Sequence, residues 1–143
     1  MKILFSFIIL TVAFTTVSAQ SDKTSAAIRK VMDDQAAAWN RGDLDAFMAI
    51  GYWNSEKLTF VSGTKVTRGW QQTLDNYKKS YDSRAKMGIL TFSDLEITML
   101  GKDAAVVLGS WALKRENDAP GGKFTLTFRK LKEGWRIVMD HTS

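Results

Sequence analysis

The prevailing hydrophobic period of this chain changes at Met87-Gly88, and that change constrains the fold more than any other feature of the sequence. Before it, apolar residues recur every three or four positions, which is the spacing of one face of a helix. After it, they alternate with polar residues, which is the spacing of one face of a strand. We therefore expect an α+β fold in which a helical first half packs on one face of an antiparallel sheet.

The first half is expected to form three helices and a small hairpin. Gln35 is the polar member of an otherwise apolar stripe in the first helix, and Gly42 is a natural stop for that helix. Asp43 is a suitable N-cap for a short second helix, because its carboxylate accepts from free backbone N–H groups. The expected bounds are 21–41 for the first helix, 58–61 and 65–67 for the hairpin, and about 69–81 for the third helix.

The second half is expected to form four long strands, over 89–100, 104–115, 123–131 and 135–141. Phe92 and Leu95 can share the inner face only if the first strand contains an extra residue, so we expect a β-bulge near Ser93-Asp94. The segment 104–108 is apolar on both faces, which is unusual for a strand with a wet outer surface. We therefore expect a second copy of the chain to cover that surface in a homodimer.

The N-terminus has the features of a secretory signal peptide. Lys2 supplies a basic start, 3–17 is an almost unbroken apolar stretch, and Val17-Ser18-Ala19 offers small or neutral residues for cleavage. The apolar stretch is shorter than the ~20 residues of a comfortable membrane span. We therefore predict a signal peptide over 1–19 and one domain over 20–143, free of the membrane and located in the periplasm or outside the cell.

The composition excludes several classes of chemistry. A single His and no Cys exclude a transition-metal cluster of the usual ligands. The sequence contains no phosphate-binding glycine loop, dinucleotide fingerprint or nucleophile elbow, so we expect no cofactor. The formal net charge of +5 is mild, and the basic residues alternate with acidic ones, so we expect no nucleic-acid partner.

The domain also carries a series of short motifs built around Gly, Trp and Tyr. They are Gln35 to Asp43, Gly51-Tyr52-Trp53, Arg68-Gly69-Trp70, Met87-Gly88, Gly109-Ser110-Trp111 and the ending from Gly134 to Ser143. Taken in order, they resemble the motifs of SnoaL-like proteins of unknown function in the nuclear transport factor 2-like superfamily. The resemblance implies a cone-shaped fold, in which three N-terminal helices and a curved antiparallel sheet enclose a cavity. It does not imply one activity, because similar folds serve ketosteroid isomerase, polyketide cyclases, epoxide hydrolases and proteins that only bind or assemble.

The implied cavity is expected to be lined by Trp39, Tyr52, Trp111 and Phe128, with Gln35 and His141 as its polar contacts. Gln35 and Trp39 share the inward stripe of the first helix. Trp111 shares a strand face with Gly109, whose missing side chain leaves room beside it. A small organic molecule is the expected partner, because ligand pockets are mostly apolar with a few polar groups. The alternatives are that the aromatic rings form core and that Gln35 bonds to backbone.

Phe128 and His141 are included because inward and outward side chains alternate along the last two strands. Arg136 belongs outside the core, and strict alternation then places Met139 and His141 inside. Asp140 has to face the opposite way, because neighbouring strand residues point to opposite faces. His141 can act as a hydrogen-bonding or proton-transfer group in the cavity, or its ring can tie the C-terminus to the backbone.

Three functions fit such a domain. The first is an exported domain that binds a small organic molecule in a mostly apolar cavity. The second is a cofactor-independent isomerase, cyclase or hydratase that uses His141 or Asp140 as its acid–base group. The third is an assembly or interaction module with a vestigial pocket. An inward carboxylate bonded to a Tyr or Gln would favour the enzyme, whereas a cavity filled by side chains would favour the assembly module.

Overall fold

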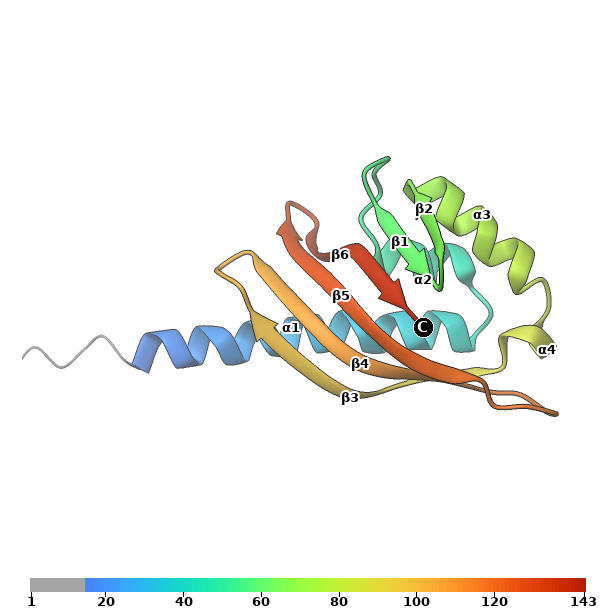
Figure 1. Ribbon diagram of the computed structural model, residues 1–143. Helices are drawn as coiled ribbons and strands as arrows, with labels where there is room; N and C mark the ends of the chain where they lie inside the picture. The colour runs from blue at the N-terminus through green and yellow to red at the C-terminus, as the bar shows by residue number, and fades with distance from the viewer. Residues whose placement is uncertain (1–14) are drawn as a thin grey trace, which may run out of the picture.

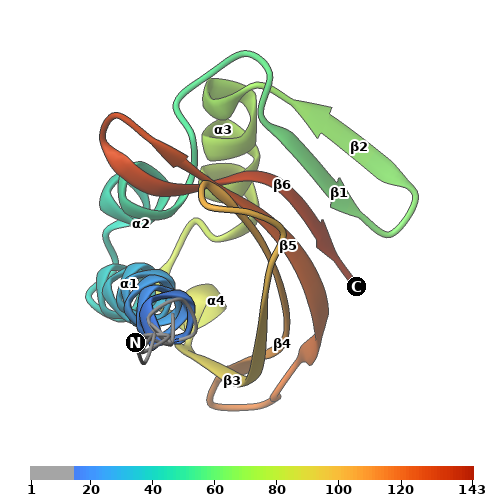
Figure 2. The same ribbon diagram turned by 90° about the vertical axis from the view of Figure 1, so that its left-hand side faces the viewer.

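The computed structural model describes the backbone of residues 15–143 and the side chains from residue 22 onward. Its three longer helices lie on one side of a curved six-stranded sheet (Figures 1 and 2), so the predicted α+β cone fold is confirmed. The helices are α1 (Thr15–Asn40), α2 (Leu44–Gly51), α3 (Trp70–Ser80) and α4 (Arg84–Met87). The strands are β1 (Thr59–Ser62), β2 (Lys65–Arg68), β3 (Ile89–Met99), β4 (Ala104–Lys114), β5 (Gly121–Leu131) and β6 (Gly134–Thr142).

The predicted signal peptide over 1–19 lies mostly outside the described residues, which begin within α1. In the described part of the chain, no helix has both the length and the apolar character needed to cross a membrane. The cleavage after Ala19 therefore stays a prediction.

The sheet has the strand order β2-β1-β6-β5-β4-β3. All pairings are antiparallel except that of β1 with β6, which is parallel and was not predicted. The parallel pair arises because the β1–β2 hairpin, which lies between α2 and α3 in the sequence, docks on the last strand of the chain. This pairing places Phe60 of β1 opposite Asp140 of β6.

The stripe predicted for the first helix is buried against the sheet. Gln35 and Trp39 are both almost fully buried, and the end of α1 is pinned to β3 by Asn40. The Asn40 side chain donates to the Leu90 carbonyl at 3.0 Å and accepts from the Leu90 backbone N–H at 2.7 Å. The predicted N-cap is also confirmed, because Asp43 Oδ1 accepts from the Ala46 backbone N–H at 2.9 Å.

A β-bulge interrupts β3 where it was expected. Asp94 has a φ of 54°, and the register with β4 shifts between Ser93 and Glu96. The extra residue lets Leu95 return to the inner face, and Glu96 is exposed on the outer one.

A second bulge, in β6, was not predicted and decides the composition of the cavity. Met139 pairs with Thr127 of β5, but the next pair joins Ile137 to Phe128, so Val138 is an extra residue. One extra residue exchanges the two faces of the strand beyond it. Asp140 is consequently buried, with 3% exposure, and Met139 is 45% exposed.

Candidate functional site

A cavity of about 360 Å³ lies between the helices and the concave face of the sheet. This volume falls within the range of roughly 300–1,000 Å³ that is typical of small-molecule pockets. Six aromatic side chains form one continuous part of its wall and are called the aromatic cluster below: Trp39, Phe47, Tyr52, Phe60, Tyr77 and Tyr81.

Tyr77 of α3 is at the centre of the aromatic cluster. Its ring packs edge-to-face on Phe47 at 5.4 Å and on Phe60 at 5.7 Å between ring centroids, and it stacks with Tyr81 at 5.9 Å. Trp39 packs edge-to-face on Tyr81 at 4.7 Å. Edge-to-face pairs are worth about 0.5–1.5 kcal/mol beyond their buried area, so the cluster has a defined shape.

Asp140 is the only acidic residue among those that line the cavity in the described part of the chain. Its Oδ2 accepts from the Tyr52 hydroxyl at 2.7 Å, and its Oδ1 accepts from the Thr142 hydroxyl. Burial raises the pKa of Asp140 to about 6, although both hydrogen bonds act in the opposite direction. The group can therefore accept or donate a proton close to neutral pH.

Two features of the backbone bring Tyr52 and Asp140 together. Tyr52 follows the last residue of α2 in an extended conformation and forms a bridge with Ile137, just before the β6 bulge. The bulge at Val138 then turns Asp140 toward the same side. Burial of the Tyr52 ring and the neighbouring Asp140 raise the pKa of the Tyr52 hydroxyl, so it stays protonated and donates.

Gln35 supplies a second buried polar group. Its Nε2 donates to the Phe47 carbonyl at 3.2 Å, while its Oε1 has no hydrogen-bond partner among the described residues. The amide lies over Gly51, where a Cβ atom would be 1.8 Å from Nε2, so only glycine allows this arrangement. A buried acceptor without a partner costs ~1–3 kcal/mol, which makes Gln35 Oε1 a candidate contact for a ligand.

Four of the six predicted site residues line the cavity: Gln35, Trp39, Tyr52 and Trp111. Trp111 also donates from Nε1 to the Ser143 carbonyl at 3.1 Å, which ties down the C-terminus. The room expected beside Gly109 is taken by Phe124, whose ring would lie 2.5 Å from a Cβ atom at that position.

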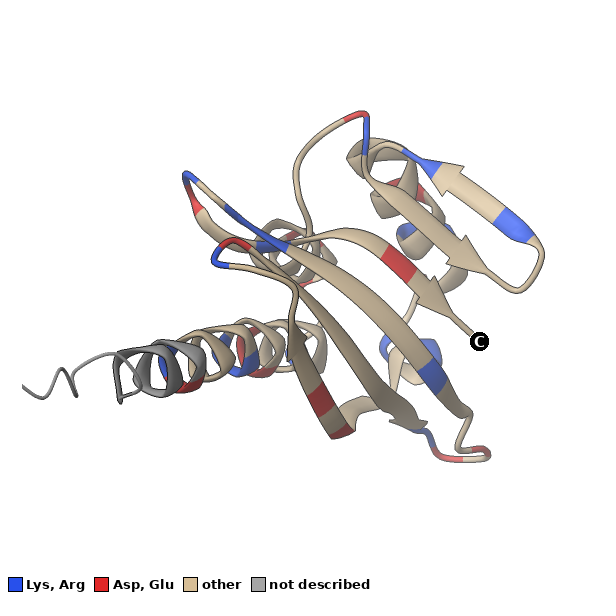
Figure 3. Ribbon diagram, turned by 60° about the vertical axis from the view of Figure 1, so that its left-hand side comes forward, with Lys and Arg blue, Asp and Glu red and all other residues tan. Residues whose placement is uncertain are grey.

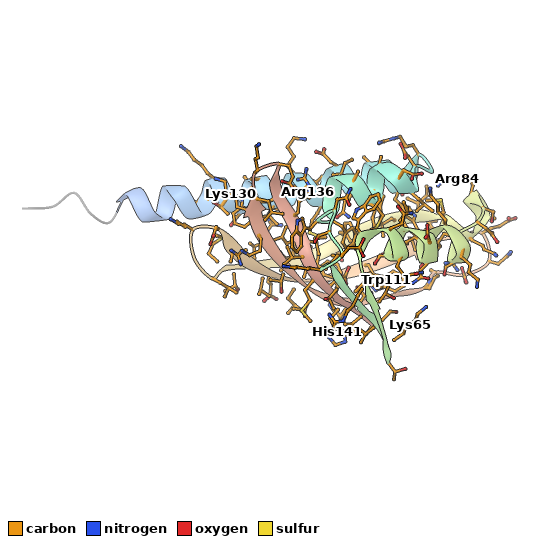
Figure 4. The ribbon with its side chains drawn as sticks, turned by 90° about the horizontal axis from the view of Figure 1, so that it is seen from above. Lys65, Arg84, Trp111, Lys130, Arg136 and His141 are labelled. Carbon is orange, nitrogen blue, oxygen red and sulfur yellow. The ribbon has the colours of Figure 1, made fainter. Side chains whose placement is uncertain are left out.

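The placement of His141 and Phe128 in the cavity was wrong. His141 is exposed on the outer face of the sheet, opposite Thr125 and Val61, because the β6 bulge exchanges the faces of that strand. Figure 4 shows it beside the β1–β2 hairpin. Phe128 faces the helices as predicted, but it is fully buried in the core and does not line the cavity.

Sequence reasoning also missed part of the site. Tyr77 and Tyr81 follow Trp70 and Leu74 at the helical spacing of the predicted third helix, so that spacing could have identified them. Asp140 was named as an acid–base candidate, but its inward position carried no such signal, because Met139 and His141 fit unbroken alternation in the last strand.

Among the described residues that line the cavity, two side chains are charged. Lys65, exposed on β2, is the only basic residue that lines the cavity in the described part of the chain, and Asp140 is the only acidic one. Elsewhere basic and acidic residues are interspersed over the elements (Figure 3). Within residues 15–143, no group of three or more His, Asp or Glu side chains is placed to hold a metal ion.

Comparison with known proteins supports the same fold. A family model described as a SnoaL-like domain matches residues 28–143. A solved structure of an NTF-2-like protein of unknown function from Shewanella oneidensis is 46% identical, with a TM-score of 0.79 over 83% of this chain and 98% of that chain. None of the curated proteins compared with the chain matches it.

More distant structures are similar in fold alone. An NTF2-like superfamily protein from Salmonella enterica is 21% identical, with a TM-score of 0.64 over 90% of this chain and 92% of that one. A domain of unknown function with a cystatin-like fold from Nostoc punctiforme is 20% identical, with a TM-score of 0.69 over 85% and 76% of the two chains. The chain belongs to the SnoaL-like family and has a nuclear transport factor 2-like fold.

Proposed function

We propose that this protein binds a small, largely apolar organic molecule in the cavity between its helices and its sheet. The observation that carries the proposal is the cavity of about 360 Å³, with an aromatic wall and two buried polar groups, Asp140 and Gln35. Apolar walls supply affinity and a few polar groups supply orientation, which is the usual composition of a ligand pocket. A cavity of this size counts against the assembly module, for which a filled pocket is expected.

The binding function is tested with N-phenyl-1-naphthylamine, an uncharged probe that fluoresces in apolar surroundings. We expect a saturable rise in fluorescence with one probe for each chain. Leu126 of β5 lines the cavity, so Leu126→Trp should fill part of it and weaken binding about tenfold or more. The matched control is Leu100→Trp, because Leu100 is 62% exposed and does not line the cavity.

His141→Ala supplies a second control for the same experiment. Its side chain is exposed on the outer face, so the substitution should leave the affinity for the probe unchanged. Equal affinity of Leu126→Trp and the unmodified protein would contradict binding in this cavity.

A second candidate function is proton transfer on the bound molecule. The hydrogen-bonded pair of Tyr52 and the inward-facing Asp140 favours it, because a buried carboxylate with a pKa of about 6 is suited to general acid–base catalysis. Such a reaction needs no cofactor, and isomerisation, cyclisation and hydration are the classes that fit. His141 no longer belongs to this hypothesis.

The proposal includes export. The basic start, the apolar stretch and the small residues before Gln20 are typical of a signal peptide, so the mature protein is expected to begin at Gln20. The intact mass of protein recovered from the periplasm or the medium measures the cleavage site. Membrane-bound protein that retains Met1 would contradict export.

The proposal also includes a homodimer formed through the outer face of the sheet. Leu108 and Met139 lie on that face with 44% and 45% of their surfaces exposed, although both are large apolar residues. Val106 lies between Thr98 and Thr127 on the same face, and Leu108 lies between Thr125 and Glu96, so Glu96 is the charged neighbour of these apolar residues in the paired strands. Burying them against a second copy removes this apolar area from water.

A further inference from the structure

The N–H groups of three side chains that line the cavity are directed at the protein's own main chain. Gln35 Nε2 donates to the Phe47 carbonyl at 3.2 Å, and Trp39 Nε1 donates to the Met87 carbonyl at the same distance. Trp111 Nε1 donates to the Ser143 carbonyl at 3.1 Å. Since a carbonyl oxygen only accepts, the bond to Phe47 shows that Nε2 is the end of the Gln35 amide that faces Phe47.

Two buried side chains of the cavity, Gln35 and Asp140, can still accept hydrogen bonds from a ligand. Gln35 Oε1 is buried and has no hydrogen-bond partner among the described residues. Each carboxylate oxygen of Asp140 accepts one bond, from Tyr52 or Thr142, and has a further lone pair. A ligand that supplies N–H or O–H donors would satisfy both groups, whereas a ligand that supplies only acceptors would leave Gln35 Oε1 unpaired.

The wall around these acceptors suits a positive charge. The faces of aromatic rings carry partial negative charge and attract cations within about 6 Å. Tyr52 belongs to the aromatic cluster and bonds directly to Asp140, while Phe60 lies opposite Asp140 in the β1–β6 pair. The cluster and the carboxylate are therefore parts of one site.

We infer that the ligand is an organic cation, a protonated primary or secondary amine on an apolar body, held by Asp140, Gln35 Oε1 and the aromatic cluster. The inference rests on the proposed binding function and specifies its ligand class. An ammonium N–H can donate to Gln35 Oε1, which a quaternary ammonium cannot do. The apolar body occupies the remainder of the cavity, toward Phe92 of β3 and Leu113 of β4.

Two basic side chains oppose this arrangement. Arg115 acts on Tyr81 of the aromatic cluster, but its charge is paired with Asp118 at 3.4 Å. Lys65 lines the cavity from β2, but its side chain is exposed, whereas Asp140 is almost fully buried. Water and salt screen an exposed ammonium strongly, and a buried carboxylate much less. Asp140 and the aromatic cluster therefore determine which charge is favoured in the interior.

The test uses three probes that share a phenyl ring and differ in charge: 2-phenylethylammonium, 2-phenylethanol and phenylacetate. Each displaces N-phenyl-1-naphthylamine from the full chain at neutral pH. We expect the ammonium to bind about tenfold or more tightly than the alcohol, and phenylacetate to bind most weakly. An alcohol that binds as tightly as the ammonium, or a preference for phenylacetate, would overturn the inference but leave the binding function intact.

Asp140→Asn separates the charge from the shape of the site. It should reduce the affinity for 2-phenylethylammonium about tenfold and leave that for 2-phenylethanol within about twofold. Asp34→Asn, which removes a surface carboxylate of α1, should change neither. If Asp140→Asn does not fold, the ranking of the three probes on the unmodified protein decides. A protein that binds neither the naphthylamine nor any phenyl probe contradicts the binding function and the inference together.

Discussion

Asp140→Asn is expected to lower the rate of base-catalysed ring opening of 5-nitrobenzisoxazole by about 100-fold or more. In this reaction a base removes the proton on C3, the N–O bond breaks, and the electron pair leaves with oxygen as a coloured nitrophenolate. The probe is flat, apolar and uncharged, so the aromatic cavity should admit it. Asparagine has nearly the shape of aspartate but cannot accept the proton, so the loss measures the base and not the binding.

The pH profile identifies the base. A carboxylate removes protons only in its ionised form, so the rate should rise as the pH passes about 6 and level off above it, following the pKa of Asp140. The hydrogen bond from Tyr52 lowers that pKa. Tyr52→Phe should therefore move the midpoint of the profile to higher pH, which a loss of packing alone would not do.

The control for this experiment is Glu96→Gln. Glu96 is exposed on the outer face of β3, so its removal should leave the rate unchanged. A rate that is equally low in the unmodified protein and in Asp140→Asn would contradict proton transfer by Asp140, and the protein would then be a binding domain alone.

The helical side of the site could be predicted from the sequence, because helical spacing holds along a whole helix. Gln35 and Trp39 stand four residues apart, and the structure places both on the cavity. Tyr77 of α3 and Tyr81, the residue that follows α3, have the same spacing and line the cavity as well. Their role could have been inferred by the same argument.

The strand side could not be predicted in the same way, because one extra residue reverses every side chain beyond it. In β3 the bulge was visible, since Phe92 and Leu95 are both apolar at a spacing that alternation forbids. In β6, Met139 and His141 fit unbroken alternation, so no residue indicated a bulge.

The β6 bulge also runs against the usual preference for apolar residues inside a protein and charged residues outside. It buries the carboxylate of Asp140 and exposes Met139, although burying a charge is costly. Conflicts of this kind between local preference and structure are expected at functional sites. The parallel pairing of β1 with β6 was missed for a different reason, since it joins residues about 80 positions apart and leaves no local pattern.

Leu108→Glu is expected to weaken the proposed dimer about 100-fold or more. Leu108 lies on the outer face of β4, opposite Thr125 of β5, and is 44% exposed in the single chain. In a two-fold dimer the substitution occurs once on each subunit, so two new carboxylates would be buried in one interface. A buried charge without a partner costs about 3–5 kcal/mol, which corresponds to a change of at least 100-fold in the dissociation constant.

Light scattering and sedimentation velocity measure this change, and circular dichroism shows whether the variant is folded. The fold should survive, because a glutamate at Leu108 of a single chain is half exposed and remains hydrated. Leu100→Glu is the matched control: Leu100 is also large, apolar and exposed, but it lies in the turn after β3 and outside the paired strands. That variant should remain dimeric. If the unmodified protein is monomeric at high micromolar concentration, the exposed apolar residues of β4 and β6 do not form a dimer interface, because burying them should favour association well below that concentration.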